Sequence, residues 1–317
     1  MSNLWHLKNW FLVGHNISWP LSFHTLFGVM YLNKHFRHSF FLNEADRKHR
    51  IVLSYLEKEL APVIDKYSSI PEDEAAEESN RIWTLWWQGE DNAPPLVRKC
   101  LSKMRENAGN NELIVLTKDN FRDYITLPEW IMEKREKGII TFAQLSDIFR
   151  FTLLSAHGGL WLDSTIYTSK PIPDDIFKYC FFSQHTKWAD TCFVQHNLYH
   201  GFSIGSRKGA KLASFARDMF FEYWRTHDVL VDYLMIDYII MLAYQHFPDI
   251  KAEIDSLPYS SERLYDLVSL LSEPYDEEYF RTLSSECIFS KLDWHRKYRT
   301  ESKGQPTYYS KVILEDL

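Results

Sequence analysis

The 317-residue sequence predicts an α/β fold in which a mostly parallel sheet is flanked by helices, with a helical extension ahead of it. Strand patterns alternate with helical patterns between residues 81 and 163, as in βαβ units. Earlier residues show helical patterns only, so we predict an N-terminal helical extension over 1–78 and the sheet domain over 79–317. The chain is 45% hydrophobic and 25% charged, which is typical of a folded protein of this length.

The N-terminal segment, residues 1–33, is apolar, aromatic and interrupted by Pro20. It has no run of about 18 uncharged apolar residues, and no small-residue cleavage site follows a basic stretch, so neither a membrane span nor a signal peptide is predicted. We expect an aromatic helical pair that packs on the main domain; an interfacial helix at a membrane surface is the alternative. Residues 44–67 read as one amphipathic helix, and the acidic stretch 71–79 as a solvated helix start or a linker.

The sheet domain begins with a strand over 81–87, a loop over 88–93 and a helix that Pro94 and Pro95 open. The remaining elements follow in order: a helix to 106, a strand over 112–117, helices over 127–137 and 141–157, a strand over 160–163, and helices over 208–227 and 231–246. Gly158 and Gly159 end the helix before the third strand. The last fifty residues show a mixed pattern.

Charge and cysteine content limit the classes of partner and compartment. With 36 basic and 43 acidic residues the net charge is −7, and phosphate-backbone binding needs a basic face, so no nucleic-acid partner is expected. The four cysteines form no CxxC pair and are too few for a disulfide framework. We interpret them as reduced, mostly buried thiols of a cytoplasmic protein.

The residues that indicate chemistry lie between 145 and 165. Asp147 and Arg150 are three residues apart on a predicted helix and therefore share a face. Asp163 ends the third strand, and ligands in such sheets bind beyond the carboxyl ends of strands. Each residue alone could be a surface ion pair or a turn former, but their combination favours a ligand site.

These motifs resemble the capsular polysaccharide synthesis proteins, among the glycosyltransferases with a DxD-type sugar-binding region. The resemblance rests on Ser146-Asp147-x-x-Arg150, Gly158-Gly159, a strand ending in Asp163, and the stretch 82–89 followed by two prolines. More distantly, the chain looks like the glucosyltransferase domains of clostridial toxins. The resemblance implies a GT-A fold and transfer of a sugar, with retention, from a nucleotide-diphosphate donor in which uridine is favoured. The implied acceptor is a surface polysaccharide or a lipid-linked saccharide in capsule-type synthesis.

The resemblance also implies roles for individual residues. Trp86 or Trp87 would stack on the donor base, although adjacent strand residues point to opposite faces and at least one is expected in the core. Asp147 would accept hydrogen bonds from sugar hydroxyls, Arg150 would contact the sugar or diphosphate, and Asp163 would bind the ribose and a Mn²⁺ or Mg²⁺ ion. Further residues expected at the donor are Gln88, Gly89, Ser146, Gly159, Trp161, Ser164 and Thr165.

The sequence departs from the DxD pattern at its third position, where Thr165 replaces the second carboxylate. A threonine hydroxyl is a weak ligand for Mn²⁺ or Mg²⁺. Either Asp163, the diphosphate, waters and a residue from elsewhere hold the metal, or cationic side chains replace it. The basic run 291–299 is a candidate source of cations, and we expect His295, Arg296 or Lys297 to neutralise the leaving diphosphate.

The acceptor site is less defined by the sequence. Asp232 and Asp237 are candidates to line it, and because they are five residues apart on a helix, at most one is expected to point inward. Asn197 is a further candidate, whereas the His196 and His200 spacing lacks a third zinc ligand. A lipid-linked acceptor at the inner face of the membrane would give the N-terminal segment a use as a peripheral membrane contact.

Two other functions remain open from the sequence. The chain would be a non-catalytic sugar-nucleotide-binding assembly subunit if Thr165 marks a lost metal site. It would alternatively be a transferase on the same fold that moves a sugar phosphate, which releases a nucleoside monophosphate in place of the diphosphate.

Overall fold

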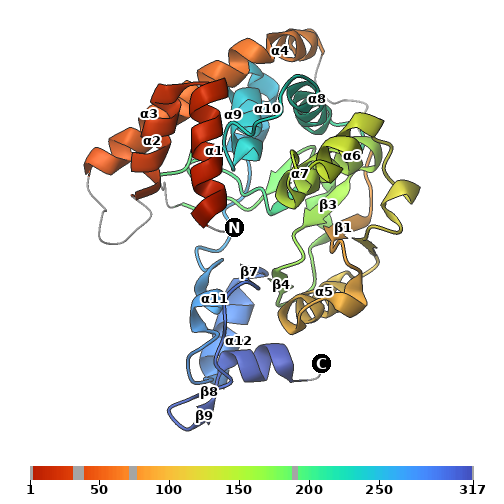
Figure 1. The fold of residues 1–317 in the computed structure, drawn as a ribbon. Coiled ribbons are helices and arrows are strands. Elements are labelled where there is room, and N and C mark those ends of the chain that lie inside the picture. The colour runs from red at the N-terminus through yellow and green to blue at the C-terminus, as the bar shows by residue number, and fades with distance from the viewer. Residues whose placement is uncertain (1–2, 31–38, 71–76, 188–191, 316–317) are drawn as a thin grey trace.

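The computed structural model of the protein describes residues 3–30, 39–70, 77–187 and 192–315, and it confirms the predicted α/β class (Figure 1). The strands are β1 Arg81–Leu85, β2 Glu112–Leu116, β3 Gly159–Leu162, β4 Ile166–Thr168, β5 Phe182–Ser183, β6 Ser203–Ser206, β7 Phe289–Lys291, β8 Glu301–Ser302 and β9 Gln305–Pro306. The helices are α1 Asn3–Asn16, α2 Trp19–Met30, α3 Ser39–Glu59, α4 Ala61–Ser68, α5 Pro95–Asn107, α6 Glu129–Glu136, α7 Phe142–His157, α8 Lys211–Thr226, α9 Met235–His246, α10 Pro248–Asp255, α11 Asp266–Leu270, α12 Glu277–Glu286 and the π-helical η5 Tyr309–Leu314.

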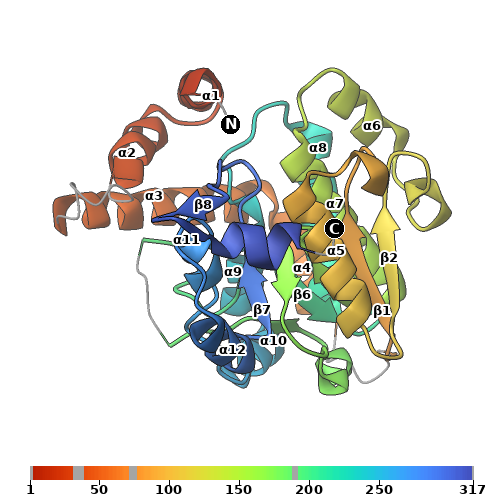
Figure 2. The same ribbon diagram turned by 90° about the horizontal axis from the view of Figure 1, so that it is seen from below.

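The central sheet is mostly parallel, as predicted. Its strand order is β2-β1-β3-β6-β5, in which β2, β1, β3 and β5 point the same way and β6 runs against them. Helices cover both faces: Figure 1 shows α7 above the strands and α5 below them, and α5 lies in front when the molecule is seen from below (Figure 2). Because β1 and β3 are parallel, their carboxyl ends lie at the same end of the sheet, between the helices that cover its two faces.

Two helices around β3 begin where their sequences predict. Pro95 stands in the first turn of α5, where its missing N–H costs no hydrogen bond. Thr141 caps α7, and its hydroxyl accepts a hydrogen bond from the Gln144 backbone N–H at 3.3 Å. The apolar face of α7 then packs on the sheet, with Leu145, Ile148 and Phe149 fully buried. This packing places the opposite side of α7, which carries Asp147 and Arg150, beside Asp163 at the carboxyl end of β3.

The glycine pair at residues 158 and 159 connects α7 directly to β3. Both residues have positive φ, at 66° and 105°, which side-chain-bearing residues rarely adopt. A Cβ on Gly159 would lie 2.3 Å from the carbonyl oxygen of Arg81, and one on Gly158 would lie 2.5 Å from the backbone nitrogen of Lys208. Gly159 is therefore required for the close approach of β3 to β1, and Gly158 for the close approach of the turn to the backbone after β6.

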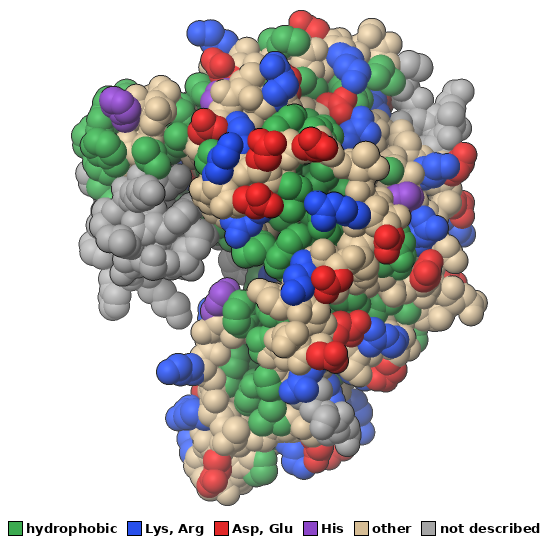
Figure 3. Space-filling model, turned by 45° about the vertical axis from the view of Figure 1, so that its right-hand side comes forward, with side chains coloured by type: hydrophobic (Ala, Val, Ile, Leu, Met, Phe, Trp, Pro, Cys, Tyr) green, Lys and Arg blue, Asp and Glu red, His purple; other side chains and the backbone are tan. Residues whose placement is uncertain are grey.

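The N-terminal region contains the predicted aromatic helical pair. Trp10 of α1 packs edge-on against Trp19 and Phe23 of α2, with ring centroids 6.0 and 6.1 Å apart, and α2 in turn lies along α3. Within the described residues no helix is long and apolar enough to cross a bilayer. Figure 3 shows hydrophobic side chains at the surface of the lobe that these helices form, and the exposed members are Phe11, Trp19, Phe23, Leu26 and Phe40.

The prediction of one helix over residues 44–67 is wrong, because α3 ends at Glu59 and α4 begins at Ala61. The cause is Pro62, which lies in the first turn of α4. Pro62 has no backbone N–H and so cannot donate a hydrogen bond to the carbonyl of Lys58. Inside a continuous helix its ring would also clash with that carbonyl. The two later helices also start several residues after their predicted beginnings, at Lys211 and Met235. Of the acidic stretch, residues 71–76 lie outside the described residues, and Glu77 pairs with Lys208 through backbone and side chain.

A smaller C-terminal lobe is joined to the main body by a second, two-stranded sheet. In it β4 pairs antiparallel with β7, and Ile166 is the partner of Lys291. A separate cluster of buried apolar side chains, including Leu267, Leu271 and Tyr308, forms the interior of this lobe. The pairing matters for function because it places Lys291 beside the loop that follows β3. The division of the chain at residue 78 stays a prediction.

Candidate active site

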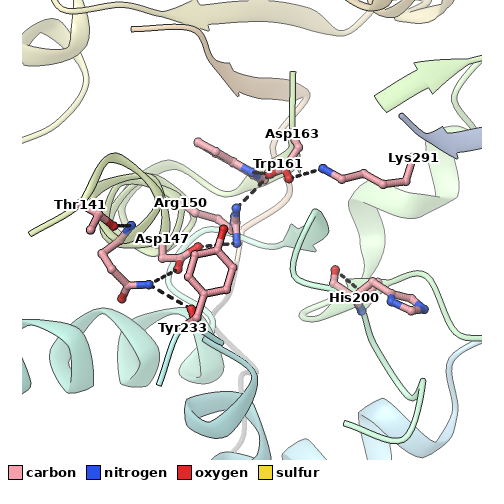
Figure 4. A network of polar contacts seen from close by, with 10 residues as sticks. Thr141, Asp147, Arg150, Trp161, Asp163, His200, Tyr233 and Lys291 are labelled. Atoms are coloured by element: carbon pink, nitrogen blue, oxygen red, sulfur yellow. Dashed lines mark hydrogen bonds and ion pairs between the residues drawn. The ribbon is translucent and has the colours of Figure 1, made fainter. Parts of the chain in front are cut away.

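The site is centred on Asp163, which directly follows the carboxyl end of the central strand β3 (Figure 4). Its Oδ1 accepts hydrogen bonds from Arg150 Nη2 at 3.0 Å and from the Trp161 indole at 3.1 Å. Its Oδ2 accepts from Lys291 Nζ at 2.6 Å. Burial alone would raise the pKa of Asp163, but the Lys291 and Arg150 cations outweigh it and hold the pKa below its usual range. Asp163 is therefore an ionised carboxylate between two cations.

The helix α7 supplies the other two predicted catalytic residues. Arg150 Nη1 donates to Asp147 Oδ1 at 3.0 Å, so the two residues share a helix face as their spacing predicts. The same guanidinium reaches Asp163 with its second nitrogen and lies over the Trp161 ring, 4.9 Å from its centroid. Arg150 is almost fully buried, and its Nε has no hydrogen-bond partner among the described residues. A buried, incompletely satisfied guanidinium is suited to an anionic ligand.

Two further carboxyl groups near Arg150 have raised pKa values. Burial raises the pKa of Asp147 to about 7, although Arg150 opposes the shift. Burial, with a contribution from the neighbouring Asp147 charge, raises the pKa of Asp237 on α9 to about 8. Both groups exchange protons near neutral pH, which suits hydrogen bonding to hydroxyls or proton transfer.

Lys291 comes from the C-terminal lobe and completes the network. Figure 4 shows its side chain reaching Asp163 from the side opposite Arg150. Its Nζ also donates to Thr165 Oγ1 at 2.9 Å and lies 5.3 Å from the centre of the Phe202 ring. The antiparallel pairing of β7 with β4 continues past the strand, because the Leu292 N–H donates to the Thr165 carbonyl at 2.9 Å. The lysine is thus held beside the Asp163–Thr165 loop by backbone pairing.

Aromatic side chains surround this polar network. The backbone carbonyl of Tyr233 accepts from Gln144 on α7 at 3.2 Å. Burial, together with the charges of Asp237 and Asp163, raises the pKa of Tyr265 to about 12. His200 stacks on Phe202 at 5.1 Å, and burial lowers its pKa to about 4, so its ring is neutral at pH 7. Such rings line sites that bind sugars or bases.

The two tryptophans after β1 have different surroundings. Trp87 packs among Phe121, Phe142 and Phe149, with ring centroids 5.4 to 6.3 Å apart, so it belongs to the core. Trp86 faces Trp294 at 5.4 Å, and its indole N–H is buried without a partner among the described residues. Trp86 is therefore the better placed of the two to stack on a ligand. After them, Gln88 is exposed and Gly89 forms the turn with φ 85°.

The other residues predicted to contact the donor do not all lie beside Asp163. Gly159 is at the opposite end of β3 from Asp163 and packs against the Arg81 backbone, which gives it a structural reason to be glycine. Ser164 is buried in the loop after β3, and Ser146 is half-buried on α7. Of the basic run, His295, Arg296 and Lys297 are exposed in the turn after β7, where Arg296 pairs with Asp293. The cation of that run that contacts Asp163 is its first residue, Lys291.

The candidate acceptor residues separate into two groups. Asp237 lies near Asp147 and Arg150, as its pKa shift reflects. Asp232 instead pairs with Lys48 of α3 at 2.9 Å and accepts the Leu234 backbone N–H, which explains the late start of α9. Asn197 lies in a turn with φ 60°, and its carbonyl accepts from Thr186. Both aspartates are buried, so the expectation that at most one of them lines the acceptor site stays a prediction.

The donor set fits a divalent metal poorly. Both oxygens of Asp163 already accept from cations, and the hydroxyl of Thr165 accepts from Lys291. Within the described ranges, no three His, Cys, Asp or Glu side chains come together as metal ligands. A Mn²⁺ or Mg²⁺ ion favours oxygen ligands without competing cations. The sequence left two alternatives: a metal held by Asp163, the diphosphate, waters and another residue, or cationic side chains in place of the metal. This geometry favours the cationic side chains.

Sequence reasoning missed Lys291, Trp294, Tyr233 and Tyr265. Lys291 opens the basic run 291–299, whereas the residues predicted to neutralise the diphosphate stand in its centre. The available signal was its place at the end of a short strand pattern, Phe289–Lys291, since strand ends position side chains more rigidly than turns. The tyrosines gave no sequence signal.

Comparison with known proteins identifies the family. No curated protein matches the chain. Among solved structures, it is similar to one titled PaToxG glycosyltransferase, with 13% identity over 65% of this chain and 83% of that chain and a TM-score of 0.40, which is too low to support any inference. Residues 30–312 match the model of a family described as capsular polysaccharide synthesis protein, and these residues are most of the sequence. The chain therefore belongs to the capsular polysaccharide synthesis protein family.

Proposed function

We propose that the protein is a glycosyltransferase that moves a sugar from a nucleotide-diphosphate donor to a saccharide acceptor in capsule-type synthesis. The observation that carries the proposal is the network of Asp147, Arg150, Asp163 and Lys291 at the carboxyl end of β3. It combines two fixed cations, which suit a diphosphate, with carboxyl groups, which suit sugar hydroxyls. Family membership supports a role in polysaccharide synthesis, and the resemblance of the motifs to DxD-type enzymes supports a GT-A fold.

We assign the donor roles accordingly. Arg150 contacts the diphosphate, Asp147 accepts hydrogen bonds from the donor sugar, and Trp86 stacks on the base. Support for Trp86 comes from its partly exposed ring and its unpaired indole N–H beside Trp294. Uridine as the base and retention at the anomeric carbon rest on the resemblance alone.

In the reaction, the bond between the anomeric carbon and the diphosphate oxygen breaks, and its electron pair goes to that oxygen. The acceptor hydroxyl forms the new bond and loses its proton to a base. The developing positive charge on the sugar is stabilised by nearby carboxylates. We assign this base to Asp237, a buried carboxyl group of α9. Burial raises its pKa to about 8, so only its ionised fraction can take the proton at neutral pH. The cations beside Asp163 stabilise the leaving diphosphate.

The test is product analysis across a panel of nucleotide sugars with the full chain. We expect slow hydrolysis of one donor in the absence of acceptor, with release of the nucleoside diphosphate, and faster turnover with oligosaccharide or polyprenyl-linked acceptors. Release of nucleoside monophosphate would indicate a sugar-phosphate transferase instead. If one donor raises the melting temperature but is never turned over with any acceptor, the chain is a binding subunit. If no donor is bound, the proposal fails.

We also propose that the N-terminal helices contact an anionic membrane surface that carries a lipid-linked acceptor. Residues 1–43 contain Lys8, Lys34 and Arg37 but no aspartate or glutamate, although the whole chain has a net charge of −7. Among the described residues of this segment, large apolar side chains are exposed on one lobe (Figure 3), and Phe11 and Phe23 are 54% and 51% exposed. A hollow beside this lobe is lined in part by Arg47, Arg50 and Lys58 of α3. Exposed aromatics next to cations are typical of interfacial contacts.

This contact predicts the result of a vesicle flotation experiment. The full chain should float with vesicles rich in phosphatidylglycerol, less with phosphatidylcholine, and less again at high salt. The double substitution Phe23→Ser and Leu26→Ser should weaken flotation about tenfold, because it removes exposed apolar area. Tyr259→Ser is the matched control, since Tyr259 is 61% exposed but lies outside these helices. Equal flotation of both variants, or none of the wild type, would refute the contact.

A further inference from the structure

We propose that Lys291 replaces the divalent metal of DxD-type sites, so that Lys291 and Arg150 together hold the donor diphosphate and the reaction needs no metal ion. This inference rests on the proposed function and specifies how the leaving group is stabilised. The positions that a DxD motif would offer a metal here are the carboxylate of Asp163 and the side-chain oxygen of Thr165. Both accept hydrogen bonds from Lys291 Nζ, at 2.6 and 2.9 Å.

Hydrogen bonds hold both the backbone and the side chain of Lys291, unlike those of an exposed surface lysine. Its backbone pairs with β4, and its own N–H donates to the carbonyl of Leu264 at 2.8 Å. The next residue, Leu292, is buried and donates to Thr165. The side chain itself is only 23% exposed. Backbone pairing on both sides therefore fixes the root of the side chain, and two hydrogen bonds fix its tip.

The charges around Asp163 favour an anionic ligand. Lys291 and Arg150 contribute two positive charges and Asp163 one negative charge. Asp147, which pairs with Arg150, has a pKa of about 7, so the two cations exceed the carboxylates when Asp147 is protonated and are balanced by them when it is ionised. A metal at the same place would be repelled by both cations and would compete with them for the Asp163 oxygens. A diphosphate meets an ammonium and a guanidinium that are partly buried, where their attraction is stronger than in water.

The hydrogen-bonding capacity of the ammonium leaves room for the ligand. A lysine ammonium has three N–H donors, and Asp163 and Thr165 accept from two of them. The third is available to an oxygen of the diphosphate. When the bond to the sugar breaks and the electron pair goes to the diphosphate oxygen, the added negative charge faces Lys291 and Arg150. This explains why threonine stands at position 165 where a DxD motif has its second aspartate. A carboxylate there would offset the positive charge of Lys291 that the diphosphate needs.

The first experiment compares turnover of the best donor in EDTA, Mg²⁺ and Mn²⁺ with the full chain. We expect the wild type to keep its rate within about twofold in all three. Lys291→Met, which keeps the length but removes the charge, should lower kcat about a hundredfold or more, in line with the loss of one preorganised electrostatic contact. Lys291→Arg should recover part of the rate. Lys178→Met is the matched control, because Lys178 is exposed in the segment Asp174–Lys178, away from this network, and it should change nothing.

A second measurement does not depend on activity. In EDTA, calorimetry should show binding of the nucleoside diphosphate to the wild type and at least tenfold weaker binding to Lys291→Met. Electron paramagnetic resonance should show no protein-bound Mn²⁺ in the wild type with nucleoside diphosphate present. The double substitution Thr165→Asp with Lys291→Ala provides two carboxylates and removes the cation, and it should bind Mn²⁺ and depend on it for any remaining turnover.

The outcomes separate this inference from the proposed function. A wild type that is inactive in EDTA and restored by Mn²⁺, with Lys291→Met unimpaired in the metal, would overturn the inference but leave the glycosyltransferase intact. If Lys291→Met unfolds, Lys291→Arg and the calorimetry of the wild type in EDTA still decide the matter. A wild type that binds no nucleotide or nucleotide sugar, with or without metal, would overturn the proposed function, and the inference would fall with it.

Discussion

Replacement of Asp163 by asparagine is expected to lower donor turnover about a hundredfold or more. The change keeps the shape of the side chain but removes the charge that Arg150 and Lys291 share. An amide group has one acceptor oxygen and would present N–H donors to one of the two cations, so at least one cation would lose its position. Loss of a single electrostatic contact to a developing charge commonly costs a factor of 10² to 10³ in kcat.

The measurement is kcat and KM for the best donor, beside a thermal unfolding curve for each variant. Asp175→Asn is the control, because Asp175 is exposed in the segment Asp174–Lys178, away from this network. The Asp163 variant will also be less stable, since one partner of a partly buried ion network is removed, at a cost of about 3–5 kcal/mol. Turnover within threefold of the wild type in a folded Asp163→Asn protein would refute the central role of this residue.

Replacement of Gly159 by alanine is expected to destabilise the fold strongly. The residue has φ 105°, and a new Cβ would lie 2.3 Å from the Arg81 carbonyl oxygen, a distance that β1 cannot tolerate without moving. Positive φ in a side-chain-bearing residue costs about 1–2 kcal/mol, and overpacking a tight site adds about 1–3 kcal/mol. The free energy of unfolding should therefore fall by about 2–5 kcal/mol.

The chain contains a control that separates the two costs. Gly138 also has positive φ, at 73°, but nothing lies within 4 Å of its added Cβ. Gly138→Ala should therefore cost only the backbone strain. Urea unfolding of both variants measures the difference. If the two substitutions cost the same, the clash with Arg81 is absent and the assigned role of Gly159 is wrong.

Much of the fold could be predicted because the signals are local. Buried apolar runs at 81–85 and 112–116 and the amphipathic pattern before Gly158 depend on residues close in sequence. The errors arose where a local detail outweighed periodicity. Pro62 divides one amphipathic pattern into α3 and α4, and the Asp232 side chain bonds the Leu234 N–H and delays the start of α9.

The candidate site could be predicted only in part, for the same reason. Asp147, Arg150 and Asp163 lie within seventeen positions, so helix geometry and one short strand bring them together. Asp237 is ninety residues from Asp147, and its position depends on how α9 packs against α8 and α3. A raised pKa is likewise a property of burial, which the sequence does not give.

The sequence alone determined the fold class, the strand that ends in Asp163, the ion pair on α7 and the resemblance to the family to which the chain belongs. The tertiary structure decided which tryptophan packs against Trp294 and which cation reaches Asp163. Lys291 is 128 positions from Asp163, and it arrives there because β7 pairs with β4 in one register. Such pairing depends on the packing of the whole C-terminal lobe. The short strand pattern Phe289–Lys291 therefore marks Lys291 as a strand end, but it does not tell that the side chain reaches Asp163.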